Sequence, residues 1–164
     1  MNSEFNNKTA IHWFRQDLRL MDNPSLNEAS KHNSLYLIYI LDDYNSGKYS
    51  IGSVSRWWLH NSLQSLNKSL DNSLSIYMGN PIEIFDELLN RFEIKSVYWN
   101  RCYEPWQINR DKQIKLFLKN KSVNVKTFNS LLLWEPWNIK KADGTAYKVF
   151  TPFYRKGCLG NEVS

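Results

Sequence analysis

A short apolar run near the start of the chain, Thr9–Phe14, is the feature that most constrains the fold. It predicts a buried strand. The Asn23-Pro24 pair that follows predicts a helix, with Asn as N-cap and Pro at the first helical position. Strand, loop and helix form the first unit of an α/β sheet, in which ligands bind at the carboxyl ends of the strands.

The loop between this strand and helix has no glycine, which argues against both a dinucleotide-binding fingerprint and a P-loop. It instead carries four charged side chains: Arg15, Asp17, Arg19 and Asp22. These side chains either line the ligand-binding end of the sheet or form ion pairs that fix the loop and dock a second domain. We favour the ion pairs, because charged loop residues more often pair than bind.

The same strand-and-helix pattern repeats as far as residue 128. Further strands are expected at Ser34–Leu41, Leu74–Met78, Ser96–Asn100 and Val123–Phe128. Helices are expected from Pro24 to about His32, from about Ser53 to Leu70, from Pro81 onwards, and from about Pro105 to Asn120. The helix that begins at Pro81 is expected to carry on its inner face Ile82, Phe85, Leu89 and Phe92. This order predicts the α/β class: a five-stranded, doubly wound, Rossmann-like parallel sheet in a three-layer α/β/α arrangement.

The alternation stops at Leu131, so we divide the chain into an α/β domain, residues 1–130, and an aromatic-rich exit segment, residues 131–164. The exit segment contains apolar and aromatic stretches around an Asp143-Gly144 turn, but no further strand-and-helix unit. Either it covers the edge of the sheet, or it leads into a second domain.

Composition supports a globular protein of 164 residues, with 42% hydrophobic and 15% aromatic residues. Seven Trp is a high number for this length, and an aromatic core is expected to hold most of them. The net charge of +5 is compatible with nucleic acid without demonstrating it. The lysines are spread along the chain, and we identify no Lys/Arg cluster interleaved with aromatic residues.

The remaining composition points to a cytoplasmic protein. The two cysteines, Cys102 and Cys158, have no metal-ligand spacing and are expected to be reduced thiols. The polar start, residues 1–9, lacks the apolar core of a signal peptide, and no apolar run approaches membrane-spanning length. We therefore expect no membrane association.

Four segments together resemble the amino-terminal domain of the photolyase/cryptochrome family, in order and spacing. They are the opening Trp13–Asn23, the second helix Ser55–Leu63, the strand exit Tyr98–Pro105 with Arg110-Asp111 behind it, and the exit Tyr147–Phe153. Family members bind FAD in a carboxyl-terminal helical domain and split pyrimidine dimers in DNA by light-driven electron transfer. Many also hold an antenna chromophore at the α/β domain.

The resemblance implies that this chain is the antenna-side part of a photolyase, with the FAD domain and its DNA contacts beyond residue 164. The family activity is that of a deoxyribodipyrimidine photo-lyase, and the chain alone is not expected to complete it. The antenna chromophore is methenyltetrahydrofolate, a deazaflavin or FMN. A monomer is expected.

The resemblance also places the chromophore at the exits of the second and fourth strands and at the start of the second helix. The candidate cofactor-binding residues are Leu41, Asp42, Arg56, Trp57, Asn100, Arg101, Cys102, Glu104 and Trp106. Members that use a deazaflavin tend to carry an acid where this chain has Cys102.

Four of these positions also have a purely structural interpretation. Asp42 caps its loop, Arg56 is a surface charge beside a core Trp57, and Glu104 caps the following helix. His12, His32 and His60 lack metal-ligand spacing and are expected to be structural, and there is no nucleophile elbow. Two other functions remain open: a cryptochrome photoreceptor and a stand-alone nucleotide-binding module, although the lack of a Gly-rich phosphate loop disfavours the latter.

Overall fold

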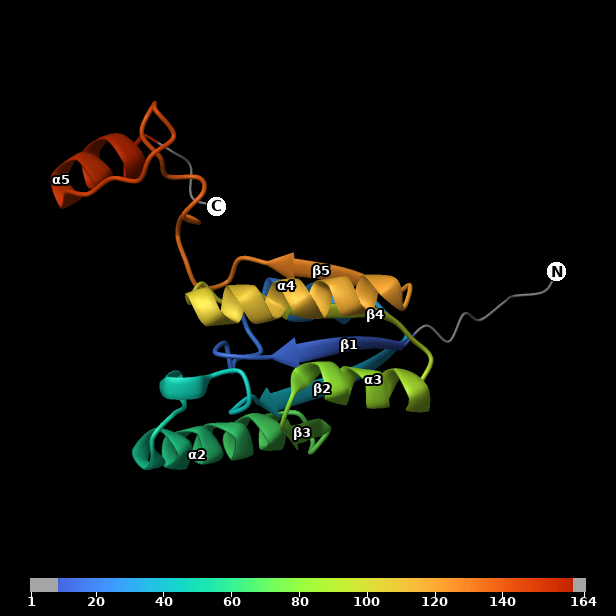
Figure 1. Cartoon of the computed structure of the whole chain (residues 1–164). Coiled ribbons are helices and arrows are strands. Elements are labelled where there is room, and N and C mark those ends of the chain that lie inside the picture. Colours follow the sequence, from blue (N-terminus) through green and yellow to red (C-terminus); the bar gives the residue numbers. More distant parts are fainter. Residues whose placement is uncertain (1–8, 161–164) are drawn as a thin grey trace. The chain divides into compact units, whose positions relative to one another are not determined.

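A five-stranded parallel sheet forms the centre of the computed structural model, which describes residues 9–160 (Figure 1). The strands are β1 (Thr9–Phe14), β2 (Ser34–Leu41), β3 (Leu74–Met78), β4 (Ile94–Asn100) and β5 (Asn124–Phe128). Their order in the sheet is β3-β2-β1-β4-β5, and every neighbouring pair is parallel. The predicted doubly wound sheet is confirmed, with β1 at its centre.

Helices cover both faces of this sheet. They are α1 (Pro24–Ala29), α2 (Ser53–Ser69), α3 (Pro81–Arg91) and α4 (Pro105–Asn120), with a short 3₁₀ turn, η1 (Gly47–Tyr49). The α3 and α4 helices pack against Ile11, Trp13 and Trp99, whereas α1 and α2 pack against the opposite side chains, such as Phe14 and Leu37. The three-layer α/β/α arrangement is therefore also confirmed.

Two helix starts form as the sequence predicts. The Oδ1 of Asn23 accepts a hydrogen bond from the backbone N–H of Leu26 at 3.1 Å. At α3, Asn80 accepts from the backbone of Ile82 at 3.1 Å and donates through Nδ2 to Glu83 at 3.2 Å. These caps satisfy N–H groups that have no partner within the helix.

The packed face of α3 differs from the expected one. Its buried residues are Pro81, Ile84, Phe85 and Leu88, which confirms Phe85 on the inner face. Phe92, also expected there, lies beyond the last helical residue and is exposed. Ile82 and Leu89 are only partly buried at the border of the core. The face that packs on the sheet is therefore rotated around the helix axis relative to the expected apolar stripe.

The expectation that most Trp residues belong to the core is wrong. Only Trp13 and Trp99 are fully buried, and their rings contact edge to face at 5.6 Å. Trp57 and Trp58 on α2 are 64% and 68% exposed, so the interpretation of Trp57 as a core residue is wrong as well. The α2 helix packs through Leu63 and Leu66 instead.

The chain forms two compact units, Met1–Ser130 and Leu131–Ser164. In the second, the described residues form α5 (Phe150–Pro152), which continues as a π-helical segment, η2 (Phe153–Cys158), and contain no strand. The polar start before Thr9 and residues 161–164 lie outside the described residues. No helix in residues 9–160 is long and apolar enough to span a membrane.

His12 makes the stability of the fold depend on pH. It is fully buried, its Nδ1 lies 2.9 Å from Ser25 Oγ, and burial lowers its pKa to about 3. In the unfolded chain, His12 therefore becomes protonated as the pH falls through 6.5, whereas in the folded chain it stays neutral until the pH approaches about 3. The free energy of unfolding therefore falls as the pH drops from 6.5 towards 3. Between pH 6.5 and pH 4.5, we expect His12 to account for a loss of about 2–3 kcal/mol.

Urea unfolding at several pH values measures this loss. The variant His12→Phe should show a flatter decline of stability below pH 6.5, whatever its stability at neutral pH. His60→Phe, on the exposed side of α2, is the matched control and should keep the decline of the unmodified chain. An equally steep decline in His12→Phe would contradict the assignment.

Candidate functional site

A pocket of about 150 Å³ lies at the carboxyl ends of β1 and β2, beside the start of α4. It is lined by Trp13, Arg15, Gln16, Tyr39, Ile40, Leu41, Asp42, Asp43, Ser46, Tyr49, Ile51, Trp106, Gln107 and Arg110. This is the end of the sheet at which α/β proteins bind their ligands. In the sheet, β2 and β3 lie on one side of β1, whereas β4 and β5 lie on its other side. The segments that follow β1 and β4 therefore diverge at this end of the sheet, next to the pocket.

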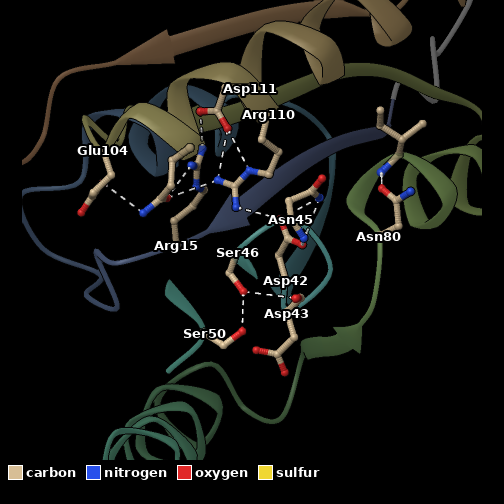
Figure 2. Close-up of polar contacts among 12 residues, drawn as sticks. Arg15, Asp42, Asp43, Asn45, Ser46, Ser50, Asn80, Glu104, Arg110 and Asp111 are labelled. Atoms are coloured by element: carbon tan, nitrogen blue, oxygen red, sulfur yellow. Dashed lines mark hydrogen bonds and ion pairs between the residues drawn. The ribbon is translucent and has the colours of Figure 1, made fainter. Parts of the chain in front are cut away.

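Three charged side chains that line this pocket, Arg15, Arg110 and Asp42, are joined by Asp111 in alternating ion pairs, and we call the four the Arg–Asp ladder (Figure 2). Arg15 Nη1 lies 2.7 Å from Asp111 Oδ2, Arg110 Nη2 lies 3.1 Å from Asp111 Oδ1, and Arg110 Nη1 lies 3.1 Å from Asp42 Oδ2. All four side chains are largely buried. Because each charge has an opposite neighbour, the ladder can be buried without leaving an unpaired ion.

Neutral groups complete the hydrogen bonding of the ladder. Gln107 Oε1 accepts from Arg15 at 3.1 Å and from Arg110 at 3.3 Å, and the indole of Trp99 donates to Asp111 at 3.2 Å. Burial opposes the charge of Arg15, but the nearby carboxylates, chiefly Asp111, outweigh it and raise the pKa of Arg15. The guanidinium is therefore a permanent cation.

Aromatic rings hold the two guanidinium groups from the sides. The Cζ atoms of Arg15 and Arg110 lie 4.6 Å and 5.2 Å from the Trp13 ring centroid, and that of Arg110 lies 5.0 Å from the Trp106 ring. A cation that stacks on a ring and pairs with carboxylates has little rotational freedom. The wall of the pocket is thus rigid.

A second polar cluster closes the loop after β1. Asn100, the last residue of β4, donates through Nδ2 to both Asp17 and Asn23, and the backbone N–H of Arg15 donates to Asp17 at 3.2 Å. Burial raises the pKa of Asp17, and the hydrogen bond from Asn100 offsets part of that rise. Arg19 donates to the carbonyl oxygens of Asp22 and Ser130. The charged side chains of this loop thus fix it in place, as the favoured interpretation expects, while Arg15 also lines the pocket. Docking of a second domain by these side chains stays a prediction.

At the exit of β2, Asp42 caps its loop as the structural interpretation expects and also joins the ladder, whereas its contact with a chromophore stays a prediction. Its Oδ1 accepts from the backbone of Asn45 at 2.9 Å, which caps the loop, while its Oδ2 joins the ladder through Arg110. The next residue, Asp43, pairs with Arg56 of α2 at 2.8 Å. This ion pair connects the start of α2 to the pocket edge.

The structure brings five of the nine candidate residues to this pocket or its edge. Leu41, Asp42 and Trp106 line it. Arg56 reaches the edge through Asp43, and Glu104 accepts hydrogen bonds from Gln16 and Gln107, each at 3.0 Å. Glu104 is the N-cap residue of α4, but its side chain makes no hydrogen bond to the helix backbone.

The other four candidates lie elsewhere in the described structure. Trp57 is exposed on α2, and Asn100 belongs to the cluster around Asp17. Arg101 Nη1 donates to the carbonyl oxygen of Thr127 at 2.6 Å. Cys102 is buried, and burial raises the pKa of its thiol to about 11.

Sequence reasoning missed Trp13, Tyr39, Gln107 and Arg110 as pocket residues. Trp13 and Tyr39 were assigned only to apolar strands, and Gln107 and Arg110 lie within a helix. The one available signal was the adjacent pair of opposite charges, Arg110-Asp111, in a helix that packs on the sheet. An ion pair within a buried helical turn needs further partners, and here these are Arg15 and Asp42.

A wider groove of about 520 Å³ adjoins the pocket and shares Arg15, Gln16, Tyr39 and Ile51 with it. Its other wall is the exposed start of α2, with Ser55, Trp58, Leu59 and Ser62. Burial raises the pKa of Tyr39 to about 12, so its phenol stays protonated and can donate a hydrogen bond. We refer to the pocket and this groove together as the cleft.

Comparison with known proteins identifies the class of α/β domain to which this site belongs. The family model for DNA photolyase matches residues 10–161. The deoxyribodipyrimidine photo-lyase of Agrobacterium fabrum is 35% identical over 153 residues, which cover 90% of this chain and 32% of that protein. Cryptochrome-2 of Arabidopsis thaliana is 32% identical over 160 residues, covering 95% of this chain and 26% of that protein.

Solved structures agree with this match. The crystal structure of a bacterial class III photolyase from Agrobacterium tumefaciens superimposes with a TM-score of 0.84 at 33% identity, covering 94% of this chain and 32% of that one. The chain therefore belongs to the DNA photolyase family and corresponds to the amino-terminal α/β domain of photolyases and cryptochromes. It spans between about a quarter and a third of the length of these relatives.

The ladder predicts a large effect of removing its central cation. Arg110→Met leaves the carboxylates of Asp42 and Asp111 buried with one fewer partner each, and should destabilise the chain by roughly 3–5 kcal/mol. Lys112→Met removes an exposed charge from the same helix and should change stability by less than about 0.5 kcal/mol. Urea unfolding measures both, and similar small losses in the two variants would contradict the role of the ladder.

Proposed function

We propose that this chain is the light-harvesting domain of a cytoplasmic deoxyribodipyrimidine photo-lyase, which repairs cyclobutane pyrimidine dimers with blue light. The observation that carries the proposal is the cleft at the carboxyl end of the sheet, in a chain that belongs to the photolyase family. In this proposal the cleft holds an antenna chromophore, and the flavin and the DNA bind a helical domain of the longer protein.

The size of the cleft fits a conjugated ligand with substituents. The inner pocket of about 150 Å³ is too small alone, since ligand sites usually measure about 300–1,000 Å³. The adjoining groove of about 520 Å³ supplies the remaining space and has the exposed Trp58 ring on its wall. A flat chromophore can therefore lie along α2 and insert one end towards Tyr39.

The polar groups at the rim suit such a ligand. Tyr39 can donate a hydrogen bond, and Gln16 can both donate and accept. The carboxylate of Glu104, held by Gln16 and Gln107, can accept from an amino-pyrimidine edge. These groups fit methenyltetrahydrofolate, a deazaflavin and FMN, and the proposal extends to all three.

The rigid ladder supports a role in energy capture. A bound chromophore would absorb light and pass the energy to the flavin, and that transfer depends on a fixed ring orientation. Arg15 and Arg110 are held by carboxylates, by Gln107 and by aromatic rings, so the inner wall cannot easily rearrange around the ligand. Limited motion of the site also reduces nonradiative loss.

A second candidate function is a cryptochrome photoreceptor. The observation that favours it is the 32% identity to a plant cryptochrome over 95% of this chain, close to the identity with a photo-lyase. The two functions share this domain, and the proposed cleft would serve both in the same way. Repair of dimers by the longer protein separates them.

Chromophore binding to the 164-residue chain tests the cleft. Trp58→Ala removes an exposed ring from the groove wall and should weaken binding of the added chromophore by roughly tenfold, through lost stacking. Trp57→Ala is the matched control, because Trp57 is equally exposed on the same helix but does not line the cleft. Fluorescence titration with each of the three chromophores measures both variants.

The outcome is clear in either direction. Binding of one chromophore that is sensitive to Trp58→Ala and insensitive to Trp57→Ala supports the cleft. No binding of any of the three, or equal losses in both variants, would show that the cleft is not an antenna site. Binding of adenine nucleotides alone would favour the nucleotide-binding module.

A chimaera that joins this chain to the flavin-binding part of the Agrobacterium photo-lyase tests the antenna role. Adding the chromophore should increase dimer cleavage at the wavelength that the chromophore absorbs, and Trp58→Ala should remove that gain. Cleavage driven by direct excitation of the flavin should remain unchanged. A chimaera that binds flavin and chromophore but gains nothing from the chromophore would contradict energy transfer.

A further inference from the structure

The second unit carries a concentration of unpaired positive charge. Among its described residues, 131–160, five are cationic and two are acidic, and one of the acids, Glu135, is buried. The cations are Lys140, Lys141, Lys148, Arg155 and Lys156. The salt bridges between described residues involve none of these five.

Aromatic rings are interleaved with these cations. Between Lys148 and Lys156 the chain carries Phe150, Phe153 and Tyr154. All three are exposed, Phe150 by as much as 72%. The expectation that the chain has no basic cluster interleaved with aromatic residues is therefore wrong for this segment. We call residues 140–156 the basic-aromatic segment.

Two of the rings form a ready platform. Phe150 and Tyr154 lie one helical turn apart, their centroids are 5.8 Å apart, and their planes differ by only 8°. Exposed and nearly parallel rings present π faces on which another planar group can stack. Exposure of large apolar side chains to water is energetically unfavourable, so a contiguous exposed patch of them indicates an interaction site.

The packing of the second unit keeps this platform turned outward. Gly157 and Cys158 are the buried residues of η2. A Cβ on Gly157 would lie 2.7 Å from Ile139 Cγ2 and 3.2 Å from the Tyr147 ring, so the absence of a side chain allows close packing there. Because η2 packs through Gly157 and Cys158, residues 148–156 remain exposed.

We propose that the basic-aromatic segment binds single-stranded nucleic acid. The phosphates would pair with the five cations, and a base would stack on the Phe150–Tyr154 platform. Charge complementarity selects this partner, because a polyanion with planar groups matches both features at once. Within residues 140–156 the one acidic residue is the exposed Asp143, so five cations face a single carboxylate in this segment. The proposal is independent of the cleft and of any chromophore.

Fluorescence anisotropy with a labelled oligothymidine of roughly 15 nucleotides tests the proposal on the 164-residue chain. The triple variant Lys148→Gln, Arg155→Gln, Lys156→Gln removes three exposed cations of the segment. The slope of log affinity against log salt should fall by about 2, since each lost phosphate contact on a single strand contributes about 0.7.

A matched variant controls for general electrostatics. Lys68→Gln, Lys112→Gln, Lys119→Gln removes the same charge from exposed positions of α2 and α4. This variant should retain the affinity and the salt slope of the unmodified chain. Circular dichroism and melting midpoints establish that both variants fold.

A second pair of substitutions isolates stacking. Phe150→Leu with Tyr154→Leu removes both rings and should weaken oligothymidine binding by roughly tenfold, with no change in the salt slope. A duplex of the same length should bind more weakly than the single strand, because its bases are already stacked.

Several results would overturn the proposal. They are equal losses in the two triple variants, no oligothymidine binding at low salt, and binding of duplex that equals or exceeds that of the single strand. Self-association of the chain, seen by light scattering and abolished by the two Leu substitutions without any oligothymidine binding, would assign the segment to protein contacts.

Discussion

The structure of the candidate site depends on the buried charge pairing of Arg15, Asp111, Arg110 and Asp42. Burying any one of these ions alone would be strongly unfavourable, so each is stable only because the others are in place. The ladder joins the ends of two strands to the first turns of α4. It thereby couples the β1 loop, the β2 exit and the helix into one rigid wall, backed by the Trp13 and Trp99 rings.

This wall limits what the sheet end can do. Arg15 and Arg110 donate to Asp111, Gln107 and Asp42, so their guanidinium groups act as a scaffold beside the other lining residues Tyr39, Gln16 and Trp106. The free volume lies outside the ladder, along α2, where exposed Trp58 forms one side. In the proposed function, this site would hold a planar chromophore in one orientation. Among residues 9–160, no group of three or more His, Cys, Asp or Glu side chains could hold a metal ion.

The two units differ in physical character. The first has charges that are buried, paired and used to build the fold, whereas the second has cations that are exposed and unpaired beside stacked rings. Paired charges give rigidity, and unpaired charges give long-range attraction for a partner of opposite sign. The two proposed surfaces thus differ in the partner that each would attract: a small planar ligand at the cleft and a polyanion at the basic-aromatic segment.

Much of this protein could be predicted from its sequence, because strands, helix periods and the Asn-Pro caps at Asn23 and Asn80 depend on residues close together in the chain. The resemblance of four motifs also indicated the family. Tertiary structure alone decided which residues meet: Asp42 and Arg110 are far apart in sequence, and of the adjacent Trp57 and Trp58 only Trp58 lines the cleft. The physical reason is that local propensity sets each element, whereas buried ion pairs and packed rings exist only after the sheet and α4 have assembled.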